Sequence, residues 1–167
     1  MVESIRGFRD MALIDGEPVY LFKKVQLLTL DLHTRFSKSH PELFFFHDIN
    51  ELPIFSDNVI PTMLNHLDII PLTIPEDATP RQRDIIEGLL EDLKTGRETT
   101  LERSYIFRAA AVDACEEVAQ IAHEKSDGPT FLKEITAVQL DAYLWQIAKN
   151  GDTRDTVRFC DPNTVYF

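Results

Sequence analysis

The sequence predicts a mostly α-helical domain that carries one small β-hairpin near its N-terminus. Apolar residues recur at three- and four-residue steps in several segments, which is the spacing of one face of an α-helix. Helix-start signals, Thr79-Pro80 and the Thr136/Gln139 pair, precede two of these segments. The dipeptide Asp15-Gly16 stands between short apolar runs and is typical of a hairpin turn.

Length and composition indicate one folded domain over residues 1–167. The chain is 44% hydrophobic and contains 11 Phe residues, which suits a compact core and argues against disorder. It has no stretch of 18 apolar residues, so we expect no membrane span. The N-terminus lacks the apolar core of a secretion signal, and two cysteines, Cys115 and Cys160, are too few for a disulfide framework. We therefore expect a reduced, cytoplasmic protein.

The formal net charge of −11 limits the kinds of ligand to expect. It disfavours direct binding to nucleic acid, which needs a positive face. It does not exclude a small phosphorylated ligand, because a local pocket can be basic while the whole protein is acidic.

The first two elements are a hairpin over Met11–Val19 and a helix over about Leu21–Phe36. Pro18 confines the hairpin to an edge, because proline donates no hydrogen bond to a neighbouring strand. The helix is expected to end before Pro41 and to bury one apolar face, made of Leu21, Val25, Leu28, Leu32 and Phe36. The apolar run 43–46 is too short to assign by periodicity, and residues 48–52 are expected to form a turn of helix.

The remaining helices are placed by their ends. Pro61 suits a helix start, with Asp57 or Asn58 as the cap. Thr79-Pro80 opens a helix that Gly96 ends, the longest helix is expected over Glu98–Glu124, and the last runs from Thr136 to Asn150-Gly151. The tail 159–167 has no period. The positions expected to be buried are Met63, Leu64 and Leu67, then Ile85, Ile86, Leu89, Leu90 and Leu93, and then Leu101, Tyr105, Arg108, Val112, Cys115, Ala119 and Ala122.

Polar side chains on otherwise apolar faces are the candidates for chemistry. The chain lacks the phosphate-binding loop, dinucleotide-binding and nucleophile-elbow motifs, and no two histidines stand four residues apart on a helix. A carboxylate among apolar residues, as Asp57 is, is unfavourable unless a charge or a hydrogen bond meets it. The candidates that remain are Lys23, Asp57, Arg108, Asp141 and Trp145.

Each candidate also has a purely structural interpretation. Asp57 would then cap a helix, and Lys23 would extend its ammonium to solvent. Arg108 and Glu116 would belong to structural ion pairs, and Trp145 would be a core residue. The pattern of residues alone supports a helical domain with a small-molecule pocket.

Several segments match, in order and spacing, those of a known family. They are Gly7-Phe8-Arg9-Asp10, Lys23-Lys24-Val25-Gln26 with Asp31-Leu32, Phe55-Ser56-Asp57 with Pro61, Arg108-Ala109 with Ala114 and Glu116, Leu140-Asp141-Ala142-Tyr143-Leu144-Trp145, and Thr164-Val165-Tyr166. This set resembles the C-terminal half of the queuosine salvage proteins, the queuosine 5'-phosphate N-glycosylase/hydrolases. Their motifs read approximately F-Y-K-R-A-Q-I-L-x-x-D-L-W, F-A-D-Y-R-V-P-Q, E-I-R-A-x-x-I-x-A-V-E and D-x-x-L-W.

The resemblance implies a helical fold of the helix-hairpin-helix DNA glycosylase type. It implies hydrolysis of the N-glycosidic bond of queuosine 5'-phosphate, a small nucleotide, without a metal or organic cofactor. The reaction frees queuine for salvage into tRNA and leaves ribose 5-phosphate.

The resemblance also implies roles for residues at matching positions. Asp57 is the candidate that stabilises or captures the positive charge at C1', and Lys23 pairs with Asp57 or holds the phosphate. Asp141 accepts hydrogen bonds from the amino groups of the base. The aromatic residues expected to contact the substrate are Phe55, Trp145 and Tyr166.

The chain also departs from the family pattern. Val59 replaces an Arg suited to binding an anion, and the N-terminal half of the family is not represented. Two alternatives follow: a non-catalytic or truncated relative that binds a nucleoside or a protein partner, and a hydrolase of a different nucleoside.

Overall fold

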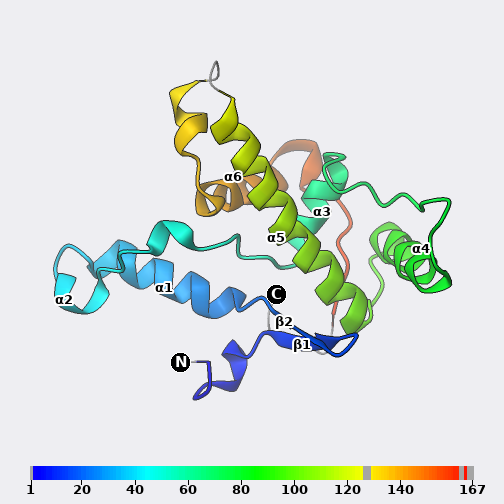
Figure 1. Cartoon of the computed structure of the whole chain (residues 1–167), viewed down its shortest axis with the longest axis horizontal. Coiled ribbons are helices and arrows are strands. Elements are labelled where there is room, and N and C mark those ends of the chain that lie inside the picture. The colour runs from blue at the N-terminus through cyan, green and yellow to red at the C-terminus, as the bar shows by residue number, and fades with distance from the viewer. Residues whose placement is uncertain (1, 126–128, 162–163, 165–167) are drawn as a thin grey trace.

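The computed structural model of the protein describes residues 2–125, 129–161 and 164 (Figure 1). It confirms a mostly helical fold with one small hairpin. In the described part of the chain, no helix combines the length and the apolarity that a membrane span needs. The elements are β1 (Met11–Ile14), β2 (Glu17–Tyr20), α1 (Lys23–Phe36), α2 (Pro41–Phe44), α3 (Val59–His66), α4 (Pro80–Thr95), α5 (Leu101–Glu124) and α6 (Ala137–Lys149), with short 3-10 helices at Arg6–Phe8, Ile49–Glu51, Thr130–Glu134 and Gly151–Thr153.

The hairpin forms as the sequence predicts. Strands β1 and β2 are antiparallel, with Met11 opposite Tyr20 and Ile14 opposite Glu17. Asp15 and Gly16 join them with φ angles of 56° and 81°, the left-handed conformation that a two-residue hairpin turn requires. Arg81 of α4 forms an ion pair with Asp15, so the turn is tied to the helical body.

The main core lies between α3, α5 and α6, and α5 crosses the middle of the molecule (Figure 1). Apolar residues of these helices and of the segment before α3 pack there: Ile54, Ile60, Leu64, Ala111, Cys115, Leu140 and Leu144. A second cluster, made of Leu89, Phe107 and Phe159, joins α4 and the C-terminal segment to the other side of α5. Helix α5 is therefore the scaffold on which the loops before α1 and α3 are placed.

Local capping signals place three helix ends correctly. Thr79 and Thr136 each form a capping box, with Gln82 and Gln139 respectively, at the starts of α4 and α6. Gly96 ends α4 in the left-handed conformation, with φ of 66°.

The expectation of a buried apolar face on the first helix is wrong for Phe36, which is exposed. Helix α1 begins at Lys23, after Phe22 in a left-handed conformation, and Lys23 is its one buried residue. Val25, Leu28 and Leu32 are half-buried. Helices α1 and α2 project from the helical body (Figure 1), so no described helix covers this face completely. Periodicity reports that a face is apolar but not which element covers it.

Three leucines expected in the core are also exposed. Two of them lie at a helix end, and the third lies on the outer face of its helix. The longest helix begins at Leu101, capped by Thr100, and Leu101 lies in its first turn. Leu67 lies just beyond the end of α3, and Leu90 lies on α4 beside the buried Leu89. The other predicted positions of these helices are buried or half-buried.

Candidate active site

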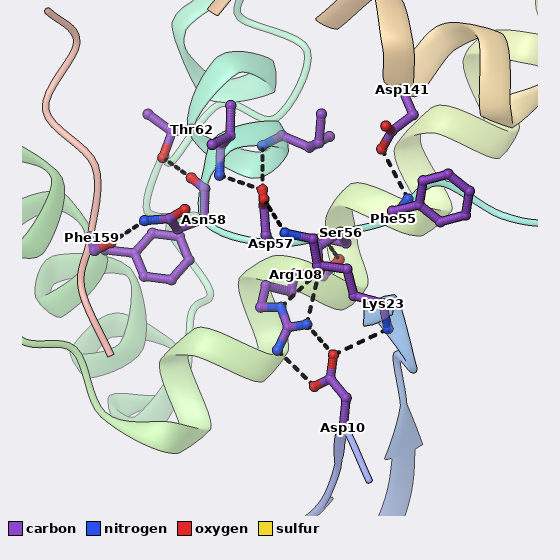
Figure 2. A network of polar contacts seen from close by, with 12 residues as sticks. Asp10, Lys23, Phe55, Ser56, Asp57, Asn58, Thr62, Arg108, Asp141 and Phe159 are labelled. Carbon is purple, nitrogen blue, oxygen red and sulfur yellow. Dashed lines mark hydrogen bonds and ion pairs between the residues drawn. The ribbon is translucent and has the colours of Figure 1, made fainter. Parts of the chain in front are cut away.

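The structure brings Lys23 and Asp57 together as a buried ion pair (Figure 2). Lys23 is the first residue of α1, and Asp57 lies in the loop before α3, 34 residues further along the chain. Lys23 Nζ donates a hydrogen bond of 2.6 Å to Asp57 Oδ2, and the two side chains are 10% and 2% exposed. Lys23 therefore does not extend to solvent, and the apolar surroundings of Asp57 contain the cation that a buried carboxylate needs.

Asp57 also holds the start of α3. Its second oxygen, Oδ1, accepts hydrogen bonds from the backbone N–H groups of Val59 at 2.7 Å and Ile60 at 3.4 Å. Asn58 is the residue at the cap position, but the Asp57 side chain satisfies the first donors of the helix. Asp57 is therefore both a helix cap and one member of a charged pair. Helix α3 starts at Val59, directly after Asn58, one of the two cap residues that the sequence predicts. Pro61 lies in the first turn, which tolerates a residue without an N–H group.

A second buried ion pair joins Arg108 of α5 to Asp10 (Figure 2). Arg108 Nη1 and Nη2 donate to Asp10 Oδ1 and Oδ2 at 2.9 Å and 2.5 Å, a bidentate arrangement. Tyr105 Oη donates to Asp10 Oδ1 at 2.9 Å, and Asp10 and Arg108 are 0% and 1% exposed. Arg108 thus belongs to a structural ion pair, whereas Glu116 is exposed. Asp10 lies before the hairpin and outside any periodic segment, so periodicity did not single it out, although it belongs to the family-like segment Gly7-Phe8-Arg9-Asp10.

The second pair positions the first. Asp10 Oδ2 accepts a hydrogen bond of 3.3 Å from the backbone N–H of Lys23. Arg108 Nε and Nη2 donate to the backbone oxygen of Ser56 at 3.0 Å and 2.8 Å, and Ser56 Oγ donates to the backbone oxygen of Arg108. The Asp10–Arg108 pair therefore fixes the backbone of Lys23 and that of the residue before Asp57.

Asp141 lies above Phe55 in Figure 2, to the right of Asp57, and is 6% exposed. Its Oδ1 accepts a hydrogen bond of 2.9 Å from the backbone N–H of Phe55. Burial raises the pKa of Asp141 to about 6; the Phe55 N–H lowers this pKa, the Asp57 charge raises it and the Lys23 charge lowers it. The charges of Asp57 and Lys23 therefore act on the Asp141 carboxyl, as expected for side chains that lie near one another.

The raised pKa of Asp141 predicts a pH-dependent effect of Asp141→Asn on stability. Between the usual pKa of 3.8 and the folded-state value of about 6, the folded protein keeps a proton that the unfolded chain loses. The wild-type stability therefore falls as the pH rises through this window, by about 3 kcal/mol in total, and the Asn variant lacks this loss. Urea unfolding at pH 4 and pH 7 should show the variant gaining stability relative to wild type by roughly this amount. A difference between the two proteins that is constant with pH would contradict the prediction.

The structure places two of the three aromatic residues that were expected to contact the substrate. Trp145 is half-buried and lies four residues after Asp141 on α6, with its ring centroid 5.7 Å from Lys23 Nζ and 4.4 Å from Lys149 Nζ. Phe55 is buried next to Asp57. Tyr166 lies outside the described residues. The structure therefore gathers Lys23, Asp57, Asp141, Trp145 and Phe55 in one place.

Cys115 takes no part in this site's chemistry. It is buried in the main core, and burial, with a smaller contribution from the Asp141 charge, raises the pKa of its thiol to about 12. Cys160 is exposed and free.

The structure is a helical domain in which a buried lysine–carboxylate pair lies beside a tryptophan and a second carboxylate. This combination suggests a protein that binds a small ligand with cationic or aromatic groups. The family model described as "Queuosine salvage protein" matches residues 1–167. The chain belongs to the queuosine salvage protein family.

Two curated relatives carry the name queuosine 5'-phosphate N-glycosylase/hydrolase. The protein from Sphaerobacter thermophilus is 34% identical over 120 residues, which cover 68% of this chain and 36% of the relative. The protein from Dictyostelium discoideum is 27% identical over 139 residues, which cover 83% of this chain and 37% of the relative. The chain thus spans a little over a third of the length of the curated relatives that it matches.

Proposed function

We propose that this protein takes part in the hydrolysis of queuosine 5'-phosphate and releases queuine. The single observation that carries the proposal is the buried Lys23–Asp57 pair, at two positions where the sequence resembles the family motifs. The names of the two relatives support the substrate. The acidic net charge of −11 supports a small nucleotide, rather than tRNA itself, as the ligand. We further propose that the protein acts in the cytoplasm.

The proposed reaction breaks the bond between ribose C1' and the nitrogen of the base. The hydroxyl of a water molecule ends on C1', and a proton ends on the released base. Positive charge develops at C1' as the bond breaks, and a fixed carboxylate next to that carbon lowers the energy of the transition state. Asp57 is the candidate, because hydrogen bonds to both of its oxygens hold its carboxylate in one orientation.

Lys23 is proposed to orient Asp57 and to contact the substrate. An ammonium has three donors, and the described residues accept from Lys23 Nζ at Asp57 Oδ2 alone. Lys23 is also the more exposed member of the pair, so the substrate approaches from its side.

The base is proposed to bind on the α6 side of Asp57. Among the described residues, Asp141 uses Oδ1 to accept the Phe55 N–H, which leaves Oδ2 for an amino group of the base. Trp145, with Phe55 and Tyr166 as further candidates, offers an aromatic surface against which a flat base can stack.

The test is incubation of the purified 167-residue chain with queuosine 5'-phosphate, with the products followed by chromatography and mass spectrometry. We expect free queuine and ribose 5-phosphate in equal amounts. Unphosphorylated queuosine and adenosine 5'-phosphate serve as comparison substrates. Binding of queuosine 5'-phosphate by the folded protein without release of queuine would instead favour a non-catalytic relative, and release of another base alone would favour a different nucleoside.

A further inference from the structure

A basic pocket lies at the C-terminal end of α6. It has a volume of about 440 Å³ and is lined by Ala148, Lys149, Arg154 and Arg158. Three cations around one pocket are unusual in a chain with a net charge of −11. Like charges repel, so such a cluster is stabilised when an anion binds between its members. Asp152 and Asp155 lie in the same segment, but they are exposed and do not line the pocket.

Arg158 is held in place by one hydrogen bond and has a second guanidinium donor, Nε, without a partner among the described residues. Its Nη2 donates a hydrogen bond of 2.9 Å to the backbone oxygen of Ala148. Its Nε is buried and has no hydrogen-bond partner in the part of the chain that the structure describes. Buried donors are normally satisfied, so this guanidinium is suited to an additional acceptor.

Three contacts connect the basic pocket to the candidate active site. Lys149 and Lys23 both place their ammonium groups near the Trp145 ring, at 4.4 Å and 5.7 Å from its centroid. Val59, whose N–H binds Asp57, packs in one cluster with Ala148 of the pocket. Asn58 Nδ2 donates a hydrogen bond of 3.0 Å to the backbone oxygen of Phe159, the residue after Arg158.

The geometry also separates the pocket from Asp141. Lys149 follows Asp141 by eight residues on α6, so their Cα atoms are about 12 Å apart along the helix axis. In Figure 2, Asn58 and Phe159 lie on one side of Asp57, and Asp141 lies on the other. This separation is on the scale of a nucleotide whose base lies at one end, ribose in the middle and phosphate at the other.

We propose that Lys149, Arg154 and Arg158 form the subsite for the 5'-phosphate of the substrate. This inference rests on the proposed function, because it assigns the base end of the same ligand to Asp141 and the ribose to Asp57. The basic pocket lies beside the start of α3, because Ala148 of the pocket packs in one cluster with Val59. Arginine binds a phosphate through two parallel N–H groups, and lysine adds a point charge.

The test uses the double variant Lys149→Gln/Arg154→Gln, since both side chains are exposed and Arg158 is kept for its bond to Ala148. Ribose 5-phosphate should raise the unfolding temperature of the wild-type chain, because a ligand that binds only the folded state stabilises it. The double variant should bind it at least about tenfold more weakly, the loss expected for charge-assisted hydrogen bonds. Ribose without phosphate is the ligand control. The matched variant is Lys94→Gln/Arg97→Gln, which removes the same amount of charge from two exposed residues, one in the last turn of α4 and one just after it.

The outcomes distinguish a failure of the proposed phosphate subsite from a failure of the proposed hydrolase activity. Loss of ribose 5-phosphate binding in the double variant, with binding kept in the matched variant, supports the subsite even if no queuine is released by the wild type. Equal stabilisation of the wild type and the double variant, or none of the wild type, overturns the subsite whether or not queuine is released. Arg154→Glu, as a second variant, repeats the test with a charge reversal and without any change on α6.

Discussion

Replacing Asp57 by Asn should lower the rate of queuine release by about 10²- to 10⁴-fold, the range seen when one preorganised catalytic group is removed. The reason is that the amide has no negative charge to stabilise the cation that develops at C1'. Asn keeps the size of Asp and still accepts the N–H of Val59, so α3 keeps its cap. The measurement is the initial rate of queuine release from queuosine 5'-phosphate at saturating substrate.

The same substitution also separates catalysis from stability. It leaves Lys23 buried without its counter-ion, and breaking a buried pair in this way costs about 3–5 kcal/mol. The double variant Lys23→Met/Asp57→Asn should recover part of this stability, because it removes the unpaired charge, but it should not recover activity. Unfolding in urea measures the first effect and product release the second.

The control for this pair of variants is Asp113→Asn, which changes an exposed carboxylate on α5 and should leave both quantities unchanged. Turnover by folded Asp57→Asn at the wild-type rate would show that Asp57 is not the catalytic carboxylate. Recovery of turnover in the double variant would contradict the roles of both residues.

Replacing Arg108 by Met should also lower the folding free energy by about 3–5 kcal/mol, because it breaks a buried ion pair. Asp10 would remain in a site with 0% exposure and lose both hydrogen bonds of the guanidinium. The backbone oxygen of Ser56 would lose its two donors as well. Denaturant unfolding followed by circular dichroism measures the loss, and a decrease below about 1 kcal/mol would contradict it.

Two further variants separate the charge of Arg108 from its shape. Arg108→Lys keeps a cation but cannot form the bidentate contact, so it should recover only part of the stability. Asp10→Asn combined with Arg108→Met removes both charges and should be more stable than Arg108→Met alone. If the network positions Lys23 and Asp57, Arg108→Lys should lower kcat more than it raises KM, at a temperature where the variant remains folded.

Elements with strong local signals could be predicted from the sequence. The capping boxes at Thr79 and Thr136 and the glycine at position 96 place the ends of α4 and α6, because each signal acts within a few residues of backbone. Asp15-Gly16 places the hairpin turn for the same reason. The cap of α3 was predicted as Asp57 or Asn58, and only the structure shows that the Asp57 side chain accepts the first N–H groups of the helix.

The candidate site was predictable in its chemistry and not in its contacts. Lys23, Asp57 and Asp141 stand out in sequence because a charged group in an apolar run needs a partner. Asp10, whose partner is 98 residues away, and Lys149, which lies over Trp145, carry no such signal.

The helical class, most helix ends, the hairpin, and the need for charges to balance Lys23 and Asp57 can be predicted from the sequence, because they follow from local backbone chemistry and desolvation. Which charges meet is seen only in the folded protein: Lys23 with Asp57, Arg108 with Asp10, and the three cations around the α6 pocket. The same holds for the exposure of Phe36 on α1. Ion pairing and burial depend on distances between segments far apart in the chain, and those distances are set only when α5 packs against its neighbours.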